Sequence, residues 1–474
     1  MQSTSKVHNY QHQKQRFTLI IWIFFSVGIL SLGSCKKDFS PIENPEDSSF
    51  DVGSFDKMGN SGKPNIIFII GDDVGYEIPN YTGGESYNTP SLNYMASHGM
   101  QFNYAFSHPD GFPSRLAAFT GKYNFRNYIN WGILPPGGHN ISNLLHDAGY
   151  ATCFVGKWQN DGGDAAIKEA GFDKYRVFLP FEYPSNQFKG RYKSPIIYEN
   201  GGFLPDSITA GRYSEDMNVD YLDSFIDQNQ RKPFFAVYSM PLVQKPWVPT
   251  PDDPEYATWD PKFDELKQDI KYFPSMVNYM DKKIGQIMKH IQAKGLRNNT
   301  MIIFTTDNAT NVKISSLWRG QLVRGLKNGT VLGSTRQPLV AYWPRGIKPN
   351  QSTNTLVDFT DFLPTFSDIA KTPVPANYGT LDGVSFYDNL TGKKGIDRTW
   401  SFCQWDNNPT DNKPMIRYIN DTIYKLYDEP PLYKRFYNMQ IDEYELNPIP
   451  AYKQTDAEKQ IRQNFIDVLL QMHN

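Results

Sequence analysis

The chain has 474 residues and a formal net charge of −2, with 48 Lys and Arg against 50 Asp and Glu. This length allows one large domain and a smaller appended one. The near-neutral balance, together with the lack of a basic stripe or nucleic-acid motif, argues against a nucleic-acid partner. Aromatic residues make up 15% of the chain, which fits packed cores and sugar-stacking surfaces equally well.

The N-terminus has the pattern of an export signal. Lys14 and Arg16 precede an apolar run, Phe17 to Leu32, which leads into Gly-Ser and Cys35. A transmembrane anchor is the alternative, but the run is shorter than the ~20 residues that a spanning helix needs. The Leu-Gly-Ser-Cys ending resembles a bacterial lipoprotein box. It implies that Cys35 is lipidated and anchors an exported protein at the cell envelope or cell surface.

Composition divides the chain into four parts. Residues 1–35 form the predicted signal, and residues 36–60, rich in Ser, Asp, Pro and Gly, read as a flexible tether. We expect the main α/β domain at 61–384 and a C-terminal subdomain at 385–474.

Cys153 and Cys403 remain once Cys35 is set aside. Cys153 lies in an apolar, strand-like run, so we expect a buried thiol. A disulfide between the two stays open as an alternative.

Two apolar runs end in oxygen-bearing side chains. The run that starts at Lys63 ends in Asp72 and Asp73, and the run from Met301 ends in Asp307 and Asn308. A continuous apolar run fits a strand buried on both faces, and ligands of such sheets bind beyond the carboxyl ends of the strands. A turn or helix cap is the plainer reading, but it explains one Asp more easily than two. An all-oxygen set suits Ca²⁺ or Mg²⁺ and disfavours zinc.

The remaining elements alternate between strands and helices, which predicts a doubly wound α/β domain. Residues 160–212 are rich in Gly, Tyr and Pro and are expected to form long loops. After residue 385, short aromatic strands and a closing helix predict a small antiparallel sheet. The predicted helices are 90–98, 141–148, 215–228, 265–293, 360–371 and 454–472, and the predicted strands are 101–106, 152–155, 234–238, 337–343, 400–405 and 422–427.

The stretch 107–121 reads as a loop that turns into a short helix. We expect Ser114 as its N-cap, Leu116 to Thr120 as its body and Gly121 as its stop. Arg115 would then lie in the first turn, where a cation opposes the helix dipole. Such a cation is consistent with an anion bound at the helix start, and an ordinary capped surface helix is the alternative.

Pro113-Ser114-Arg115, followed after four residues by Thr120-Gly121, resembles the signature of the type I sulfatases. The resemblance covers roughly residues 63–450 and is closest to Bacteroidetes polysaccharide sulfatases. It implies the alkaline-phosphatase-like fold, a doubly wound mixed sheet flanked by helices with a small C-terminal antiparallel subdomain. Further matching segments are Gly71-Asp72-Asp73, Thr89-Pro90, Gly156-Lys157-Trp158, Thr306-Asp307-Asn308, Lys327 with Gly329, Leu356-Val357-Asp358 and Asp361-Phe362-Leu363-Pro364-Thr365.

The resemblance assigns roles to individual residues. It implies that three cations, Arg115, Lys157 and Lys327, hold a sulfate group. It also implies that Asp72, Asp73, Asp307 and Asn308 bind a metal ion, with Ca²⁺ favoured over Mg²⁺.

Three positions depart from the family pattern. Gly111 stands where the family has the Cys or Ser that is oxidised to formylglycine, whose hydrate attacks sulfur. Gln159 and Gln244 stand where the family has histidines, and no His occurs between His146 and His290. Glutamine cannot shuttle protons as a general acid or base near neutral pH, but it can still donate a hydrogen bond.

Three functions are compatible with this pattern. The first is a surface lipoprotein that binds sulfated polysaccharide and is catalytically impaired, a pseudoenzyme of polysaccharide degradation. The second is a sulfate-ester hydrolase whose nucleophile is Asp110 or a metal-bound water. The third is a structural calcium-binding surface protein. Retention of three separated cations, for which folding has no obvious need, speaks against the third.

Overall fold

The computed structural model describes residues 62–127, 134, 137–160, 162–178, 190–405 and 415–472. The predicted export signal, Cys35 and the predicted tether lie outside the described residues. The described residues belong to one compact unit. Within the described ranges, no helix combines the length and the apolar character needed to cross a membrane.

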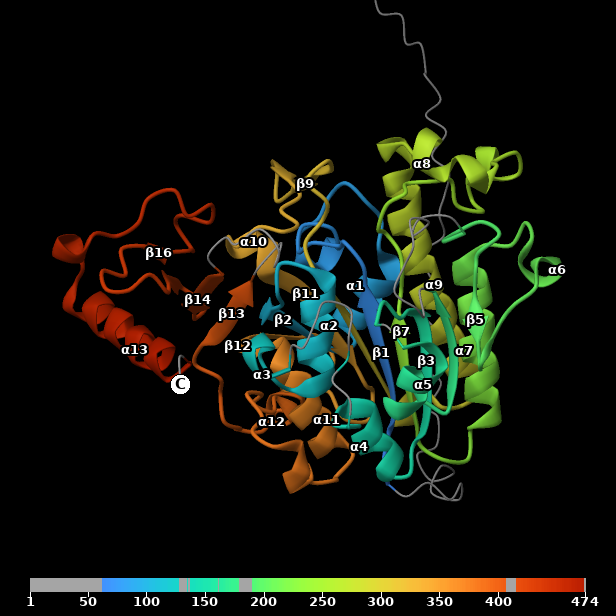
Figure 1. Cartoon of the computed structure of the whole chain (residues 1–474), viewed down its shortest axis with the longest axis horizontal. Coiled ribbons are helices and arrows are strands. Elements are labelled where there is room, and N and C mark those ends of the chain that lie inside the picture. The colour runs from blue at the N-terminus through green and yellow to red at the C-terminus, as the bar shows by residue number, and fades with distance from the viewer. Residues whose placement is uncertain are drawn as a thin grey trace, which may run out of the picture. The chain divides into compact units, whose positions relative to one another are not determined.

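A large mixed sheet lies at the centre of this unit (Figure 1). Its strand order is β12-β2-β11-β8-β1-β7-β3-β4-β5-β6. Strand β1 pairs in parallel with β7 and β8, whereas β11 runs antiparallel to both β2 and β8. The strands are β1 (Asn65–Gly71), β2 (Met100–Phe106), β3 (Ala151–Lys157), β4 (Lys174–Phe178), β5 (Tyr198–Glu199), β6 (Gly202–Phe203), β7 (Phe234–Ser239), β8 (Thr300–Thr306), β11 (Arg336–Tyr342) and β12 (Gln351–Asp358).

Helices cover both faces of the sheet, which explains why β1 is apolar along its length. Ile66, Phe68 and Ile70 pack into one core, and Ile67 and Ile69 pack into another. This alternation follows from the period of two in a strand. The first core includes α2 (Gly111–Thr120), α4 (Ile141–Asp147), α5 (Gly163–Glu169) and α11 (Phe362–Ile369), and the second includes α1 (Pro90–Ser97), α7 (Ser214–Gln228) and α9 (Phe273–Ala293).

A four-stranded antiparallel sheet lies near the C-terminus and packs against the last helix, α13 (Asp456–Met472) (Figure 1). Phe402, Ile419 and Leu426 of the sheet share a core with Phe465 and Leu469 of the helix. These findings confirm the predicted fold class, a doubly wound mixed sheet with a small antiparallel subdomain. The strands are β13 (Ser401–Trp405), β14 (Ile416–Asn420), β15 (Tyr424–Tyr427) and β16 (Phe436–Asn438).

Two predicted elements outside the candidate site differ clearly from the structure. The helix expected from residue 265 begins at Phe273, because Pro274 occupies its first turn, a position that proline favours. A separate short helix, α8 (Asp264–Lys267), precedes it. The expected loop region 160–212 contains α5 and β4, and β4 extends the main sheet beside β3.

The cysteines of the described part are both free. Cys153 lies buried in β3, as predicted, and Cys403 lies buried in β13. The alternative of a disulfide between them is therefore wrong.

Candidate metal and anion site

Three buried carboxylates meet where two neighbouring strands end. Asp72 and Asp73 follow β1, and Asp307 follows β8, its parallel neighbour. One oxygen from each of the three lies within 4.8 Å of the others. Parallel strands present their carboxyl ends at the same edge of a sheet, so residues far apart in sequence become neighbours. Asn308 lies beside these carboxylates: its Nδ2 donates to Asp73 Oδ1 at 2.8 Å.

The donor atoms of this set fit a hard divalent cation. Asp72 Oδ1, Asp73 Oδ2 and Asn308 Oδ1 are buried, and none has a hydrogen-bond partner among the described residues. Buried oxygens without partners are costly unless a cation or donor satisfies them. Carboxylate and amide oxygens are the ligands that Ca²⁺ and Mg²⁺ prefer.

Each carboxylate of the cluster also pairs with a different cation. Lys157 Nζ lies 2.5 Å from Asp72 Oδ2, and Arg115 Nη1 lies 2.5 Å from Asp307 Oδ2. Lys327 forms the third ion pair, with Asp73. Three positive and three negative side chains are thereby brought together in one buried region. The structure thus unites the three cations and the four metal-ligand candidates that the sequence indicated.

Burial and charge together perturb the titration of these groups. Burial, reinforced by the charge of Asp72, raises the pKa of Asp307 to about 7. The pKa of Asp73 is also raised by burial. Burial opposes ionisation of Asp72 as well, but Lys157, Lys327 and Arg115 hold its pKa below the usual range. Repulsion among the carboxylates is the kind of strain that a bound divalent cation relieves.

Both glutamines turn their side-chain oxygens toward the cations. Gln159 Oε1 accepts from Arg115 Nη2 at 2.8 Å. Gln244 Oε1 accepts from Lys157 Nζ at 3.2 Å and from Arg191 Nη1 at 2.6 Å. The two positions where the sequence departs from histidine therefore lie at the site. There their oxygens accept hydrogen bonds from cations, a role that needs no titratable group.

Arg191 is a site residue that the sequence analysis did not identify. It is 3% exposed and joins the cluster through Gln244. It lies in the region expected to form loops, which has no periodicity that could place it. The signal that the sequence did offer is its setting: Arg191 stands between Gly190 and Tyr192, two residues before another basic residue, Lys193.

Helix α2 begins earlier than predicted. Its N-cap is Asp110, whose side chain accepts from Phe112 N at 3.3 Å, and Gly111 is the first helical residue. The predicted cap, Ser114, instead donates from its hydroxyl to the Asp110 carbonyl at 2.7 Å. Arg115 therefore lies beyond the first turn of α2, not within it as predicted. Its guanidinium contacts the carboxylate cluster by pairing with Asp307. The predicted stop at Gly121 is confirmed, with φ of 66°.

Gly111 faces the ion pair of Arg115 and Asp307. A Cβ built on Gly111 would lie 2.1 Å from Asp307 Oδ2 and 2.8 Å from Arg115 Nη1. Atoms this close overlap, so in this arrangement the ion pair occupies the space in which a side chain at position 111 would begin.

The sulfatase family model matches residues 64–372, which carry all of these site residues. The chain belongs to the sulfatase family. A second model, described as the C-terminal part of N-sulphoglucosamine sulphohydrolase, matches residues 331–473. The resemblance to type I sulfatases and the alkaline-phosphatase-like fold are thereby confirmed.

Two sulfatases illustrate this relationship, and one solved structure shares the fold. Arylsulfatase A of Homo sapiens is 28% identical over 359 residues, covering 69% of this chain and 68% of that protein. The N-acetylgalactosamine-6-O-sulfatase of Bacteroides thetaiotaomicron is 25% identical over 430 residues, covering 74% of this chain and 81% of that protein. The structure of BT4656 in complex with its substrate D-glucosamine-2-N,6-O-disulfate matches with a TM-score of 0.68 and 20% identity, covering 86% and 97% of the two chains.

Proposed function

We propose that this sulfatase-family protein binds sulfated glycan and does not cleave it by the formylglycine route. One observation carries the proposal. Gly111 offers no atom that could become a nucleophile, while the cations that suit a sulfate group are retained.

The chemistry of the cluster supports an anionic ligand. Arg115, Lys157 and Lys327 balance the three carboxylates, and Arg191 adds a further positive charge. Sulfate presents several acceptor oxygens in a compact anion, which suits a group of Lys and Arg donors. The ligands named for two relatives, an N-acetylgalactosamine 6-O-sulfate and a disulfated glucosamine, motivate the choice of a sulfated sugar.

We propose Ca²⁺ as the metal ion, with Asp72, Asp73, Asp307 and Asn308 as its ligands. The partnerless oxygens of three of these residues support this assignment. When bound, the ion would supply two positive charges that attract a sulfate oxygen. It would also give the carboxylates a partner other than Lys157, Arg115 and Lys327, whose donors could then hold the sulfate.

Asp110 is engaged in a way that disfavours it as a replacement nucleophile. Its side chain accepts from Phe112 N and caps α2, a contact that an attacking carboxylate would have to give up. Hydrolysis through a metal-bound water is the remaining catalytic route, and a measurement of released sulfate decides it.

We also propose that the protein is exported and anchored to the cell envelope through a lipid on Cys35, as the N-terminal pattern indicates. Replacement by Cys35→Ala should move the protein out of the detergent-extracted membrane fraction. Wild-type protein found only in the cytoplasm, or a C35A variant that stays in the membrane fraction, would refute the anchor.

Calorimetry with matched sulfated and desulfated oligosaccharides, with and without Ca²⁺, tests the binding function, followed by an assay of the same mixtures for free sulfate. We expect binding that requires both the sulfate group and Ca²⁺, without release. Release above the rate of the protein-free control would show that the protein is a hydrolase. Equal binding of sulfated and desulfated sugars would show that the cation cluster has no role in recognition.

A further inference from the structure

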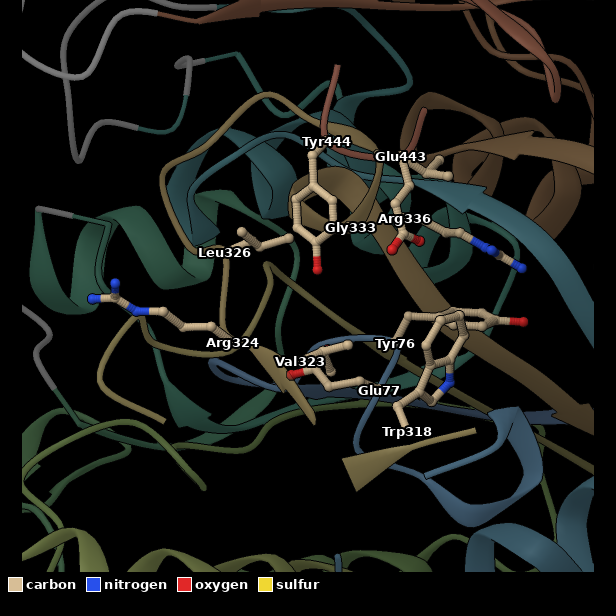
Figure 2. A pocket seen from close by; sticks show the side chains of 11 residues that line it. Tyr76, Glu77, Trp318, Val323, Arg324, Leu326, Gly333, Arg336, Glu443 and Tyr444 are labelled. Carbon is tan, nitrogen blue, oxygen red and sulfur yellow. The ribbon is translucent and has the colours of Figure 1, made fainter. Parts of the chain in front are cut away.

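A pocket is lined by segments that follow or precede residues of the ion-pair cluster in the sequence (Figure 2). Tyr76 and Glu77, which line it, follow Asp73 along the chain, and Leu326, another lining residue, precedes Lys327. Thr310 ties these segments together: its hydroxyl accepts from Gly75 N at 2.8 Å, and its carbonyl accepts from Lys327 N at 3.0 Å. The wall of the pocket is therefore built from the segments that position the metal and anion site.

The pocket has aromatic walls. Trp318 lies in β9 (Ser315–Trp318), the first strand of a hairpin with β10 (Gln321–Arg324), and Tyr444 enters from the C-terminal part of the chain. Figure 2 shows Tyr444 on one side and Trp318 with Tyr76 on the other. Trp318 Nε1 donates to the Thr82 carbonyl at 3.0 Å, which fixes its ring. Fixed aromatic rings with a few polar groups are typical of sites for small organic ligands such as sugar rings.

The polar groups that face this space are acidic. Glu77 Oε1 is buried and has no hydrogen-bond partner among the described residues. Glu443 points its carboxylate into the pocket beside Tyr444 (Figure 2).

The two arginines of the lining make their contacts away from the centre of the pocket. They point away from the space between Tyr444 and Glu77 in Figure 2. Arg324 Nε donates to the Val312 carbonyl at 2.5 Å. Arg336 Nε donates to the Asn103 carbonyl at 2.7 Å, and its guanidinium stacks on Tyr76 at 3.9 Å from the ring centroid.

Glu77 and Glu443 thus place carboxylates in the centre of this pocket, whereas the nearby site holds the cations Arg115, Lys157 and Lys327. Carboxylates accept hydrogen bonds from sugar hydroxyls but repel sulfate and carboxylate groups. A glycan that spans both regions must carry its negative charge at one end only.

We propose, on the basis of the proposed function, that this pocket receives an uncharged sugar ring next to the sulfated one. The preferred ligand is then a sulfated glycan whose neighbouring sugar carries neither sulfate nor a uronic acid carboxylate. The aromatic rings contact the face of that sugar, and Glu77 and Glu443 accept hydrogen bonds from its hydroxyls.

Two disaccharide probes test this inference by calorimetry on the Ca²⁺-loaded full chain. One is a monosulfated galactan disaccharide whose second sugar is unsulfated, and the other is a monosulfated chondroitin disaccharide whose second sugar is a uronate. We expect the neutral-neighbour probe to bind at least about tenfold more tightly, because like charges facing each other are strongly unfavourable.

Variants assign the preference to the pocket. In the double variant Glu77→Gln and Glu443→Gln, the affinity ratio of the two probes should fall to below about threefold, because the repulsion is removed. Glu255→Gln, a change at an exposed glutamate of another region, should leave the ratio unaltered. Trp318→Phe keeps a ring of similar shape and should weaken the neutral-neighbour probe less than Trp318→Ala does.

The outcomes separate this inference from the proposed function. Failure of every sulfated probe to bind overturns the proposed function, and this inference with it. Sulfate-dependent binding with equal affinity for both probes overturns the inference alone. An affinity ratio that stays the same in the Glu77→Gln and Glu443→Gln double variant also overturns the inference. This outcome does not depend on whether the Trp318 variants fold.

Discussion

Asp307 occupies the place where a side chain on Gly111 would begin, with its Oδ2 only 2.1 Å from the built Cβ position. The same oxygen lies 2.5 Å from Arg115 Nη1. In this arrangement the ion pair therefore uses space that is open only because position 111 has no side chain. A residue larger than glycine requires the pair to move.

Substitution of Gly111→Ala should lower the free energy of unfolding of the metal-free protein. We expect a loss of about 1–3 kcal/mol, the usual cost of overpacking, even though alanine favours a helix more than glycine does. Urea unfolding measures it. Gly202→Ala is the control, because a Cβ there meets nothing within 4 Å. A G111A variant as stable as wild type would show that the ion pair moves aside without cost.

Gly111→Cys, expressed in a host that forms formylglycine, should not become an efficient sulfatase. Gln159 and Gln244 stand where the family has histidines, and an amide side chain cannot act as a general acid or base near neutral pH. Sulfate release from an aryl sulfate ester, with mass spectrometry to confirm the aldehyde, is the measurement. Rapid turnover by the converted variant would show that the site is intact except for its nucleophile.

Removal of divalent metal should lower the thermal stability of the protein. The carboxylates of Asp72, Asp73 and Asp307 crowd one another, and a ligand of the native state stabilises it by about 2.7 kcal/mol at a hundred times its Kd. Thermal unfolding in Ca²⁺, in Mg²⁺ and in chelator measures the effect. Asp73→Asn should reduce the Ca²⁺-dependent shift, whereas Asp147→Asn, at an exposed residue, should keep it. A wild-type melting temperature that is indifferent to metal would argue against a metal site.

Replacement of the cations should weaken sulfate recognition. Arg115→Ala and Lys327→Met each remove a charged donor, a loss of about 1.5–3 kcal/mol in affinity for a sulfated oligosaccharide. Lys157→Met should also destabilise the metal-free fold, because it leaves the Asp72 carboxylate buried without its cation. Lys313→Met, at an exposed lysine, serves as the control in calorimetry and in urea unfolding. Unchanged affinity in all three site variants would place the sulfate group elsewhere.

Glu215 should give the protein a pH-dependent stability away from the candidate site. Burial raises the pKa of Glu215 from 4.5 to about 7, and its partners include the hydroxyl of Tyr238. The folded state therefore holds a proton that the unfolded chain releases, so stability falls as the pH rises from about 4.5 to about 7. A shift of this size corresponds to about 3 kcal/mol at most.

Glu215→Gln removes this titration. Relative to the variant, the wild type should lose free energy of unfolding between pH 4.5 and pH 7, and the difference should stay constant above pH 7. Urea unfolding at a series of pH values measures the difference, with Glu265→Gln, at an exposed residue, as the control. Parallel pH profiles for the wild type and the Glu215→Gln variant would contradict the prediction.

The sequence by itself determined the sheet, the family and most of the site. Apolar runs such as Asn65 to Gly71 have no polar face, so they are stable only as strands covered on both sides. Polar residues that follow such strands then lie at one edge of the sheet, which is why Asp72 and Asp307 were recognisable as neighbours. The sequence alone also indicated three candidate cations, Arg115, Lys157 and Lys327, because each stands in a segment that resembles the sulfatase pattern.

Only the tertiary structure decided how these groups meet. Each cation forms an ion pair with a different carboxylate. Gln244 accepts hydrogen bonds from both Lys157 and Arg191. Asp307 occupies the space beside Gly111. The pocket beside Trp318 is lined by residues from distant parts of the chain, among them Glu77 and Tyr444. Such contacts depend on the paths of the intervening loops, which leave no periodic pattern in the sequence, and side-chain direction at a loop is set by packing rather than by local preference.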